Sequence, residues 1–132
     1  MSPSFVFDAT GAIAFGVGAA GGPKIISATL QNILNIVDYG LDAGAAMATL
    51  RIHHQWLPDK LSLEPGFSPA LKKSLEDLGH TVDNKTNLAR ASSFLVKGGI
   101  YFGASDPRGE GNAAAYTKIP KPLPTAGAVK DR

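Results

Sequence analysis

A glycine-rich turn followed by proline is the feature that most restricts how this chain can fold. The turn covers residues 18–22 (Gly-Ala-Ala-Gly-Gly), and Pro23 behind it suits the first position of a helix, where no backbone N–H is needed. Two β-prone segments, 4–7 and 12–18, precede the turn and are separated by the turn-forming residues 8–11. Together these segments predict a β-hairpin that runs through the glycine-rich turn into a helix.

The segment after Pro23 carries an apolar stripe at helical spacing. The stripe consists of Ile26, Leu30, Ile33, Leu34 and Val37. Positions i, i+4, i+7, i+8 and i+11 fall on one side of a helix, so the pattern predicts a helix that buries this stripe and stops at Gly40. A shorter alanine-rich helix is expected over 42–48, with Asp42 as its N-cap.

The second half of the chain mixes short strands with one further helix. Extended segments are expected at 51–57, 61–63, 81–82, 93–96 and 100–102. Ser68 and Pro69 predict the start of a helix that ends at Gly79. Because this order lacks the regular βαβ alternation of a parallel sheet, we expect an α+β fold built in layers. The proline-rich residues 117–132 are expected to form a disordered or extended tail.

The composition excludes several classes of function. There are no cysteines, which removes thiol catalysis, disulfides and cysteine-based zinc sites. Lys and Arg number 13 against 11 Asp and Glu, a net charge of +2 without a basic block, so nucleic acid is not an expected partner. No apolar run is long enough to cross a membrane, and the N-terminus does not resemble a signal peptide. No cofactor is expected.

His53 and His54 invite a metal interpretation. Adjacent residues of a strand point to opposite faces of the sheet, so these two rings would not readily share one ion. His80 is the only other histidine, and no acidic cluster at ligand spacing joins the three. We therefore expect structural histidines with hydrogen-bonded rings, and no metal site.

Two further polar motifs receive structural interpretations. Asp106-Pro107-Arg108 is typical of a turn, or of a carboxylate–guanidinium pair that orders a loop. Ser92-Ser93 could suggest a nucleophile, but the Gly-x-Ser-x-Gly motif does not surround it. We interpret these serines as a pair of hydroxyl groups at a strand edge.

Gly21 and Gly22 stand where chemistry could occur. The first N–H groups of a helix have no partner within it, and the helix dipole makes that end partly positive. Glycines leave room for a ligand to approach those amides, so the turn could bind a carboxylate or stabilise an oxyanion during acyl transfer. The alternative is a tight turn in which glycine serves only backbone geometry.

Five blocks of this sequence resemble the small subunit of γ-glutamyltranspeptidases, in the order in which that family has them. They are residues 1–6, 18–26, 38–40, 51–59 and 103–108. The most specific block is 51–59, Arg-Ile-His-His-Gln-Trp-Leu-Pro-Asp, which differs from the family's string only by Ile in place of Phe. The blocks identify residues 1–116 as similar to the C-terminal part of that small subunit.

The resemblance implies an N-terminal nucleophile hydrolase fold, a four-layer αββα sandwich, of which this chain would be a part truncated at its N-terminus. In that family, a threonine freed by self-cleavage attacks the γ-glutamyl carbonyl of glutathione or a related amide. Gly21 and Gly22 align with the two glycines of the family's oxyanion hole. The threonine and the residues that grip the glutamyl group lie upstream of the first block, so this chain alone is expected to be inactive.

The resemblance also implies partners. They are the missing N-terminal part of the small subunit, a large subunit, and glutathione or other γ-glutamyl compounds in the intact enzyme. A periplasmic or extracellular location is implied by the family alone. Two alternatives stay open, namely a non-catalytic binding or assembly scaffold and a subunit completed by a separately encoded chain.

Overall fold

The computed structural model describes residues 3–113, so the predicted tail at 117–132 lies outside the described residues. The elements are β1 (Ser4–Phe7), β2 (Ile13–Ala20), α1 (Lys24–Val37), α2 (Ala43–Ala48), β3 (Ile52–His53), β4 (Leu61–Leu63), α3 (Pro69–Asp77), β5 (Val82–Asn84), β6 (Arg90–Lys97) and β7 (Ile100–Ser105). Within residues 3–113, no helix is long and apolar enough to span a bilayer.

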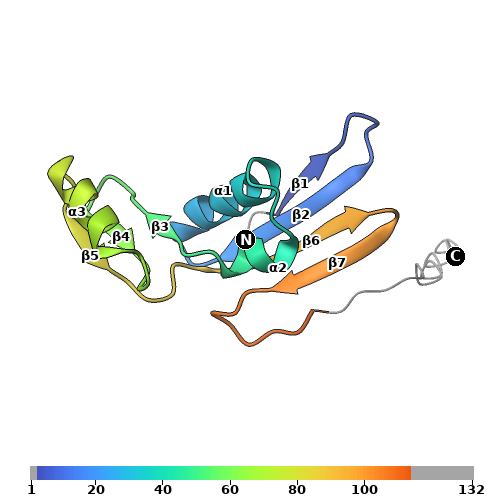
Figure 1. Ribbon diagram of the computed structural model, residues 1–132. Coiled ribbons are helices and arrows are strands. Elements are labelled where there is room, and N and C mark those ends of the chain that lie inside the picture. Colours follow the sequence, from blue (N-terminus) through green and yellow to red (C-terminus); the bar gives the residue numbers. More distant parts are fainter. Residues whose placement is uncertain (1–2, 114–132) are drawn as a thin grey trace, which may run out of the picture.

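The main layer is a four-stranded antiparallel sheet in the order β1-β2-β6-β7, with α1 and α2 on one face (Figure 1). The predicted hairpin of β1 and β2 is confirmed. Its turn is ordered by Asp8, whose Oδ1 accepts hydrogen bonds from the backbone N–H of Thr10 at 2.8 Å and of Ala12 at 3.0 Å. The α+β class predicted from the sequence is therefore the class observed.

The core lies between this sheet and the two helices. It consists of Phe15, Val17, Ala19, Ala28, Met47, Ala89 and Ala91. Alternate residues of a strand point to opposite faces, so the residues of β2 in this cluster face the helices while Gly16 and Gly18 lie on the other face. β2 runs two residues beyond the predicted end at Gly18, because Ala19 and Ala20 continue the pairing with β6.

The prediction that α1 buries its apolar stripe holds for Ile33, which packs against the core, and is wrong for the rest of the stripe. Ile26 is 76% exposed, Leu30 53% and Val37 58%, whereas the fully buried positions are Ala28, Thr29 and Asn32. Small residues let a helix approach a sheet closely, and Ala28 takes that position against β2. The periodicity identified an apolar side of the helix correctly, but apart from Ile33 the residues of that side are exposed.

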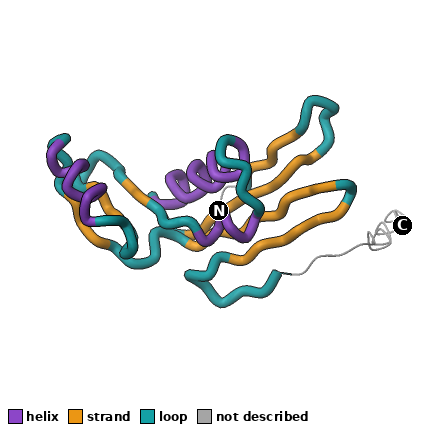
Figure 2. The backbone as a smooth tube through the Cα atoms, viewed as in Figure 1, coloured by secondary structure: helices purple, strands orange, loops and turns teal. Residues whose placement is uncertain are grey.

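A second, smaller sheet has the order β3-β4-β5 and lies to one side with α3 (Figure 2). β4 and β5 are parallel and joined through α3, so this part of the chain contains a βαβ unit, although the regular βαβ alternation of a parallel sheet is lacking in residues 3–113, as expected. Gln31 of α1 ties β3 to the main layer, because its side chain donates to the carbonyl of Ile52 at 2.8 Å and accepts from the Ile52 N–H at 2.9 Å.

Candidate functional site: the turn between β2 and α1

The turn from β2 to α1 consists of Gly21, Gly22 and Pro23. Both glycines have positive φ, 151° at Gly21 and 61° at Gly22, in the region that residues with side chains rarely adopt. Pro23 has helical dihedral angles, φ −61° and ψ −21°, directly before Lys24. The N–H of Ile25 then donates to the carbonyl of Gly22 at 3.1 Å. The local sequence thus fixes a sharp reversal into the helix.

The start of α1 is open to a ligand. Gly21 and Gly22 are exposed, and a Cβ atom placed on Gly22 would meet no heavy atom within 4 Å. Among the described residues, the amide hydrogens of these two glycines have no acceptor, and the first turn of α1 carries no acidic side chain. Free N–H groups at the positive end of a helix dipole can receive an anion or a developing oxyanion. Pro23 contributes no such donor.

Gly21 lies directly against Ala89, a residue distant in the sequence. A Cβ atom on Gly21 would stand 2.8 Å from both the Cα and the Cβ of Ala89, which is closer than real Cβ atoms come. Ala89 is 4% exposed and has a φ of 76°, which is unusual for a residue with a side chain. Nothing in the local sequence around Ala89 indicates this contact, and sequence reasoning missed it.

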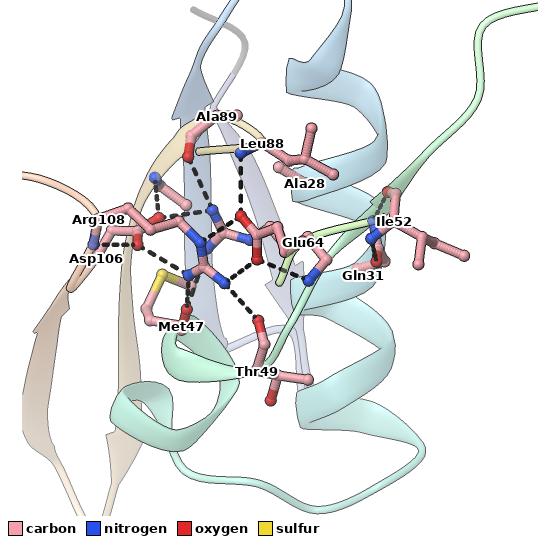
Figure 3. Close-up of polar contacts among 12 residues, drawn as sticks. Ala28, Gln31, Met47, Thr49, Ile52, Glu64, Leu88, Ala89, Asp106 and Arg108 are labelled. Carbon is pink, nitrogen blue, oxygen red and sulfur yellow. Dashed lines mark hydrogen bonds and ion pairs between the residues drawn. The ribbon is translucent and has the colours of Figure 1, made fainter. Parts of the chain in front are cut away.

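A buried ionic cluster consists of Arg51, Glu64, Asp106 and Arg108, of which the last three are labelled in Figure 3. The Nη1 of Arg51 lies 2.7 Å from the Oδ2 of Asp106, and both side chains are 2% exposed. Arg108 donates through Nε to the Oε1 of Glu64 at 2.6 Å and through a second bond to Oε2. Arg108 Nη1 also reaches Asp106 Oδ1 at 3.1 Å. The two arginines and two carboxylates are thus matched in charge.

The cluster also satisfies backbone groups from several elements. The end of α2 is held by Arg108, which donates to the carbonyls of Met47 at 2.8 Å and Thr49 at 2.9 Å. The segment before β6 is held by Glu64, which accepts from the N–H of Leu88 at 3.0 Å. Such bonds replace the water that these buried polar groups lose, so the cluster fixes how the elements sit relative to one another.

Both carboxylates of the cluster stay ionised at neutral pH. Burial by itself would raise the pKa of Glu64, but hydrogen bonds from Arg108 and from the backbone N–H groups of Leu88 and Arg51 outweigh burial and lower it. Burial likewise opposes ionisation of Asp106, and hydrogen bonds from the N–H groups of Arg108 and Ala91, together with the arginine side chains, lower its pKa. The hydrogen bond between Arg108 and Glu64 is the main reason that the pKa of Arg108 is raised.

The structure contains both features predicted for Asp106-Pro107-Arg108, the carboxylate–guanidinium pair and the turn. Asp106 pairs with Arg108, and the N–H of Gly109 donates to the Asp106 carbonyl at 3.0 Å to close a turn. The pairing of Asp106 with Arg51 and the participation of Glu64 were not predicted. Both involve residues far apart in the sequence, and isolated charged residues give no signal of such partners.

The rings of His53 and His54 are hydrogen-bonded, as predicted. His53 contacts Ser27 Oγ at 2.8 Å and Gln55 Oε1 at 2.9 Å through its two ring nitrogens. His54 Nε2 lies 3.0 Å from Asp59 Oδ1. In the described part of the chain, no group of three or more His, Asp or Glu side chains is arranged to hold a metal ion.

The serine pair is not at a strand edge. Ser92 and Ser93 belong to β6, which pairs with β2 on one side and β7 on the other, so they lie in the interior of the sheet. The Oγ of Ser93 is buried without a hydrogen-bond partner among the described residues. A buried hydroxyl that no base contacts has no means of activation as a nucleophile.

The chain is similar to known proteins in sequence and in fold. The family model for γ-glutamyltranspeptidase matches residues 1–116. The glutathione hydrolase proenzyme of Escherichia coli strain K12 is 46% identical over 92 residues, which are 69% of this chain and 16% of that protein. Glutathione hydrolase proenzyme 2 of Schizosaccharomyces pombe is 36% identical over 119 residues, covering 87% of this chain and 20% of that protein. The chain therefore spans about a fifth or less of the length of these relatives.

Solved structures agree with the sequence matches. The crystal structure of a Helicobacter pylori γ-glutamyltranspeptidase mutant superposes with a TM-score of 0.78 at 32% identity, covering 83% of this chain and 61% of that chain. A cephalosporin acylase from Bacillus halodurans reaches a TM-score of 0.79 at 22% identity, over 89% of this chain and 22% of that chain, a likeness of fold alone.

The helix layer on an antiparallel sheet and these superpositions define part of an N-terminal nucleophile hydrolase. Within that class, the sequence matches are decisive. The chain belongs to the γ-glutamyltranspeptidase family.

Proposed function

We propose that this chain supplies the oxyanion-binding turn of an enzyme that hydrolyses or transfers γ-glutamyl groups. The observation that carries this proposal is the pair of exposed, acceptor-free amides at Gly21 and Gly22, set at the start of α1. They occupy the positions that the family resemblance assigns to the oxyanion hole. The substrate class, glutathione and related γ-glutamyl amides, is proposed from the relatives named as glutathione hydrolases.

The chemistry requires a nucleophile from outside these 132 residues. A threonine hydroxyl attacks the γ-glutamyl carbonyl, and its proton passes to a nearby base. The carbonyl oxygen becomes an oxyanion, and N–H donors that are already oriented toward it lower the barrier. Collapse expels the amine and leaves a γ-glutamyl ester, which water or an acceptor amine then cleaves. We propose that the chain alone does not catalyse this reaction.

The face of the main sheet opposite the helices supports a need for partners. Phe5 and Phe94 have ring centroids 6.3 Å apart, and Phe94 and Tyr101 5.7 Å, so an aromatic row crosses β1, β6 and β7. Phe5 is 52% exposed and Tyr101 44%. An apolar face of this kind is ordinarily covered by another layer. We propose that the remaining part of the small subunit and a large subunit cover it, in a periplasmic or extracellular enzyme.

Co-expression tests the proposal. The full chain is produced alone and together with the complementary part of the Escherichia coli relative, and both samples are assayed with a chromogenic γ-glutamyl anilide. We expect activity only in the combined sample. Activity of the chain alone would contradict the proposed need for an external nucleophile.

A combined sample that assembles but stays inactive would favour the non-catalytic scaffold. Assembly is followed by light scattering, so that failure to associate is separated from failure to react. A combined sample carrying Gly21→Ala is the matched control, because the added methyl collides with Ala89 and displaces the turn.

A further inference from the structure

We propose that Arg51 is a positioning residue for the Gly21–Gly22 turn and acts through the left-handed backbone of Ala89. This inference rests on the proposed function of the turn. It extends that function from the two glycines to a side chain from a different part of the chain that touches neither of them.

Arg51 fixes Ala89 from one side. Its Nη1 donates to the carbonyl of Ala89 at 3.1 Å, while Nη2 donates to the carbonyl of Met47 at 3.2 Å. The guanidinium is itself held by Asp106, 2.7 Å from Nη1, and is 2% exposed. Because both Nη atoms of this planar guanidinium are bonded, the group has little freedom to rotate. The Ala89 carbonyl that it binds therefore has little freedom to move.

The residues next to Ala89 are also fixed by the ionic cluster. Glu64 accepts from the N–H of Leu88 at 3.0 Å, and Asp106 accepts from the N–H of Ala91 at 2.8 Å. Ala89 and Asn87 have φ values of 76° and 65°, conformations that are costly for residues with side chains. Such conformations persist when the surroundings over-determine them, and they concentrate near functional sites.

Ala89 transmits this constraint to the turn by direct contact. Its Cα and Cβ stand where a Gly21 side chain would be, so the Gly21 backbone rests against Ala89 without an intervening group. Movement of Ala89 therefore allows movement of Gly21 and of the amides that follow it. An oxyanion site depends on donors that are held in place before the reaction. Looser packing between Ala89 and Gly21 therefore lowers kcat rather than the affinity for substrate.

The variants are Arg51→Lys and Ala89→Gly. Lysine keeps the charge beside Asp106 but cannot donate in a fixed fork to both carbonyls. Glycine at 89 adopts positive φ freely and removes the methyl group that packs on Gly21, while the ionic cluster stays intact. Ser68→Ala is the control for loss of stability, because it removes the N-cap of α3, and among the described residues Ser68 makes no hydrogen bond to Ala89 or to the ionic cluster.

Two measurements are made on the full chain. The first measurement, by NMR on the chain, gives the chemical shifts of the Gly21 and Gly22 amide resonances. The second is kcat and KM for a γ-glutamyl anilide in the assembled complex with the complementary part of the Escherichia coli relative. For Arg51→Lys and Ala89→Gly we expect shifted glycine resonances and a fall in kcat on the order of tenfold or more at unchanged KM. For Ser68→Ala we expect a loss of stability, with kcat close to wild type.

Unchanged resonances and unchanged kcat in folded Arg51→Lys and Ala89→Gly would overturn the inference. If Arg51→Lys fails to fold, Ala89→Gly decides alone, since it relieves a backbone restriction and leaves every charged side chain in place. An inactive wild-type complex would instead refute the proposed function, and the glycine resonances would then decide the coupling by themselves.

Discussion

The ring of Phe94 lies directly over Gly16 on the open face of the main sheet, where a Cβ atom at position 16 would stand 2.5 Å from the ring carbon Cε1. The two residues are paired across β2 and β6. The same Cβ would stand 3.2 Å from the Phe5 ring, so Gly16 provides the space in which the aromatic row crosses β2. The row depends on the absence of a side chain at this position.

Gly16→Ala is therefore expected to destabilise the chain by about 1–3 kcal/mol, the range found when extra atoms are forced into a packed site. Urea denaturation followed by far-UV circular dichroism measures this change. Gly18→Ala is the matched control, because Gly18 lies on the same strand and the same face, and a Cβ there would meet Pro3 only at 3.5 Å, an ordinary contact distance. If Gly16→Ala lowers the free energy of unfolding no more than a substitution at a surface site does, the Phe94 ring moves aside freely.

Glu64→Gln is expected to lower the free energy of unfolding by about 3 kcal/mol or more, because it leaves the Arg108 guanidinium buried against a neutral amide. The contrast is Asp77→Asn, which removes an exposed pair with Lys73 whose side chains are 62% and 74% exposed. That change is expected to cost less than about 0.5 kcal/mol. Urea titrations at neutral pH measure the free energy of unfolding of both variants. Equal losses of stability in Glu64→Gln and Asp77→Asn would contradict the structural importance assigned to the cluster.

Acid is expected to unfold the chain through the same cluster. The pKa values of Glu64 and Asp106 are lowered from the ordinary values of 4.5 and 3.8, so the unfolded chain binds protons at higher pH than the folded chain does. Stability from these groups is complete above the ordinary values and is lost as pH falls below them toward the folded-state values. Urea midpoints taken from pH 7 down to pH 3 measure the slope, which should be flatter in Glu64→Gln.

Substitution at the two glycines of the turn should have unequal effects. Gly22→Ala places a methyl group in open space at a φ of 61° and is expected to cost about 1 kcal/mol. Gly21→Ala drives its methyl group into Ala89 and is expected to cost at least twice as much. Thermal unfolding of both variants gives the comparison. Ala89→Gly should not rescue Gly21→Ala, since the Cα of residue 89 also lies 2.8 Å from the added atom.

Local chemistry predicted the elements of this fold well. Ser68 caps α3 as expected, with its Oγ accepting from the N–H of Leu71 at 3.1 Å, and Asp42 caps α2 through the N–H of Ala45 at 2.8 Å. Caps, turns and periodicity depend on neighbours in the sequence, so the sequence displays them directly. The strand–turn–helix junction at Gly21 and Gly22 was recognisable for the same reason.

The side of α1 that meets the sheet could not be read from periodicity. Ile26, Leu30 and Val37 of the predicted stripe are exposed, whereas Ala28 and Asn32 face the core. A periodic pattern identifies which residues share a side, but contact is decided by the shape of the surface that the helix packs against. The ionic cluster escaped prediction because Glu64 and Arg108 meet only after the whole sheet is assembled.

The position of β6 between β2 and β7 determines the order in which this chain can fold. β1 with β2, and β6 with β7, are hairpins whose partners are close in the sequence and can pair early. The β2–β6 seam joins Phe15 to Leu95 across the intervening helices and the small sheet, so closing it costs more loop entropy than closing either hairpin. Long-range closure is slow because the loop entropy is lost before the new contacts form. During that interval the two hairpins present unpaired edges, so a chaperone or an early-arriving partner would have its greatest effect on this step.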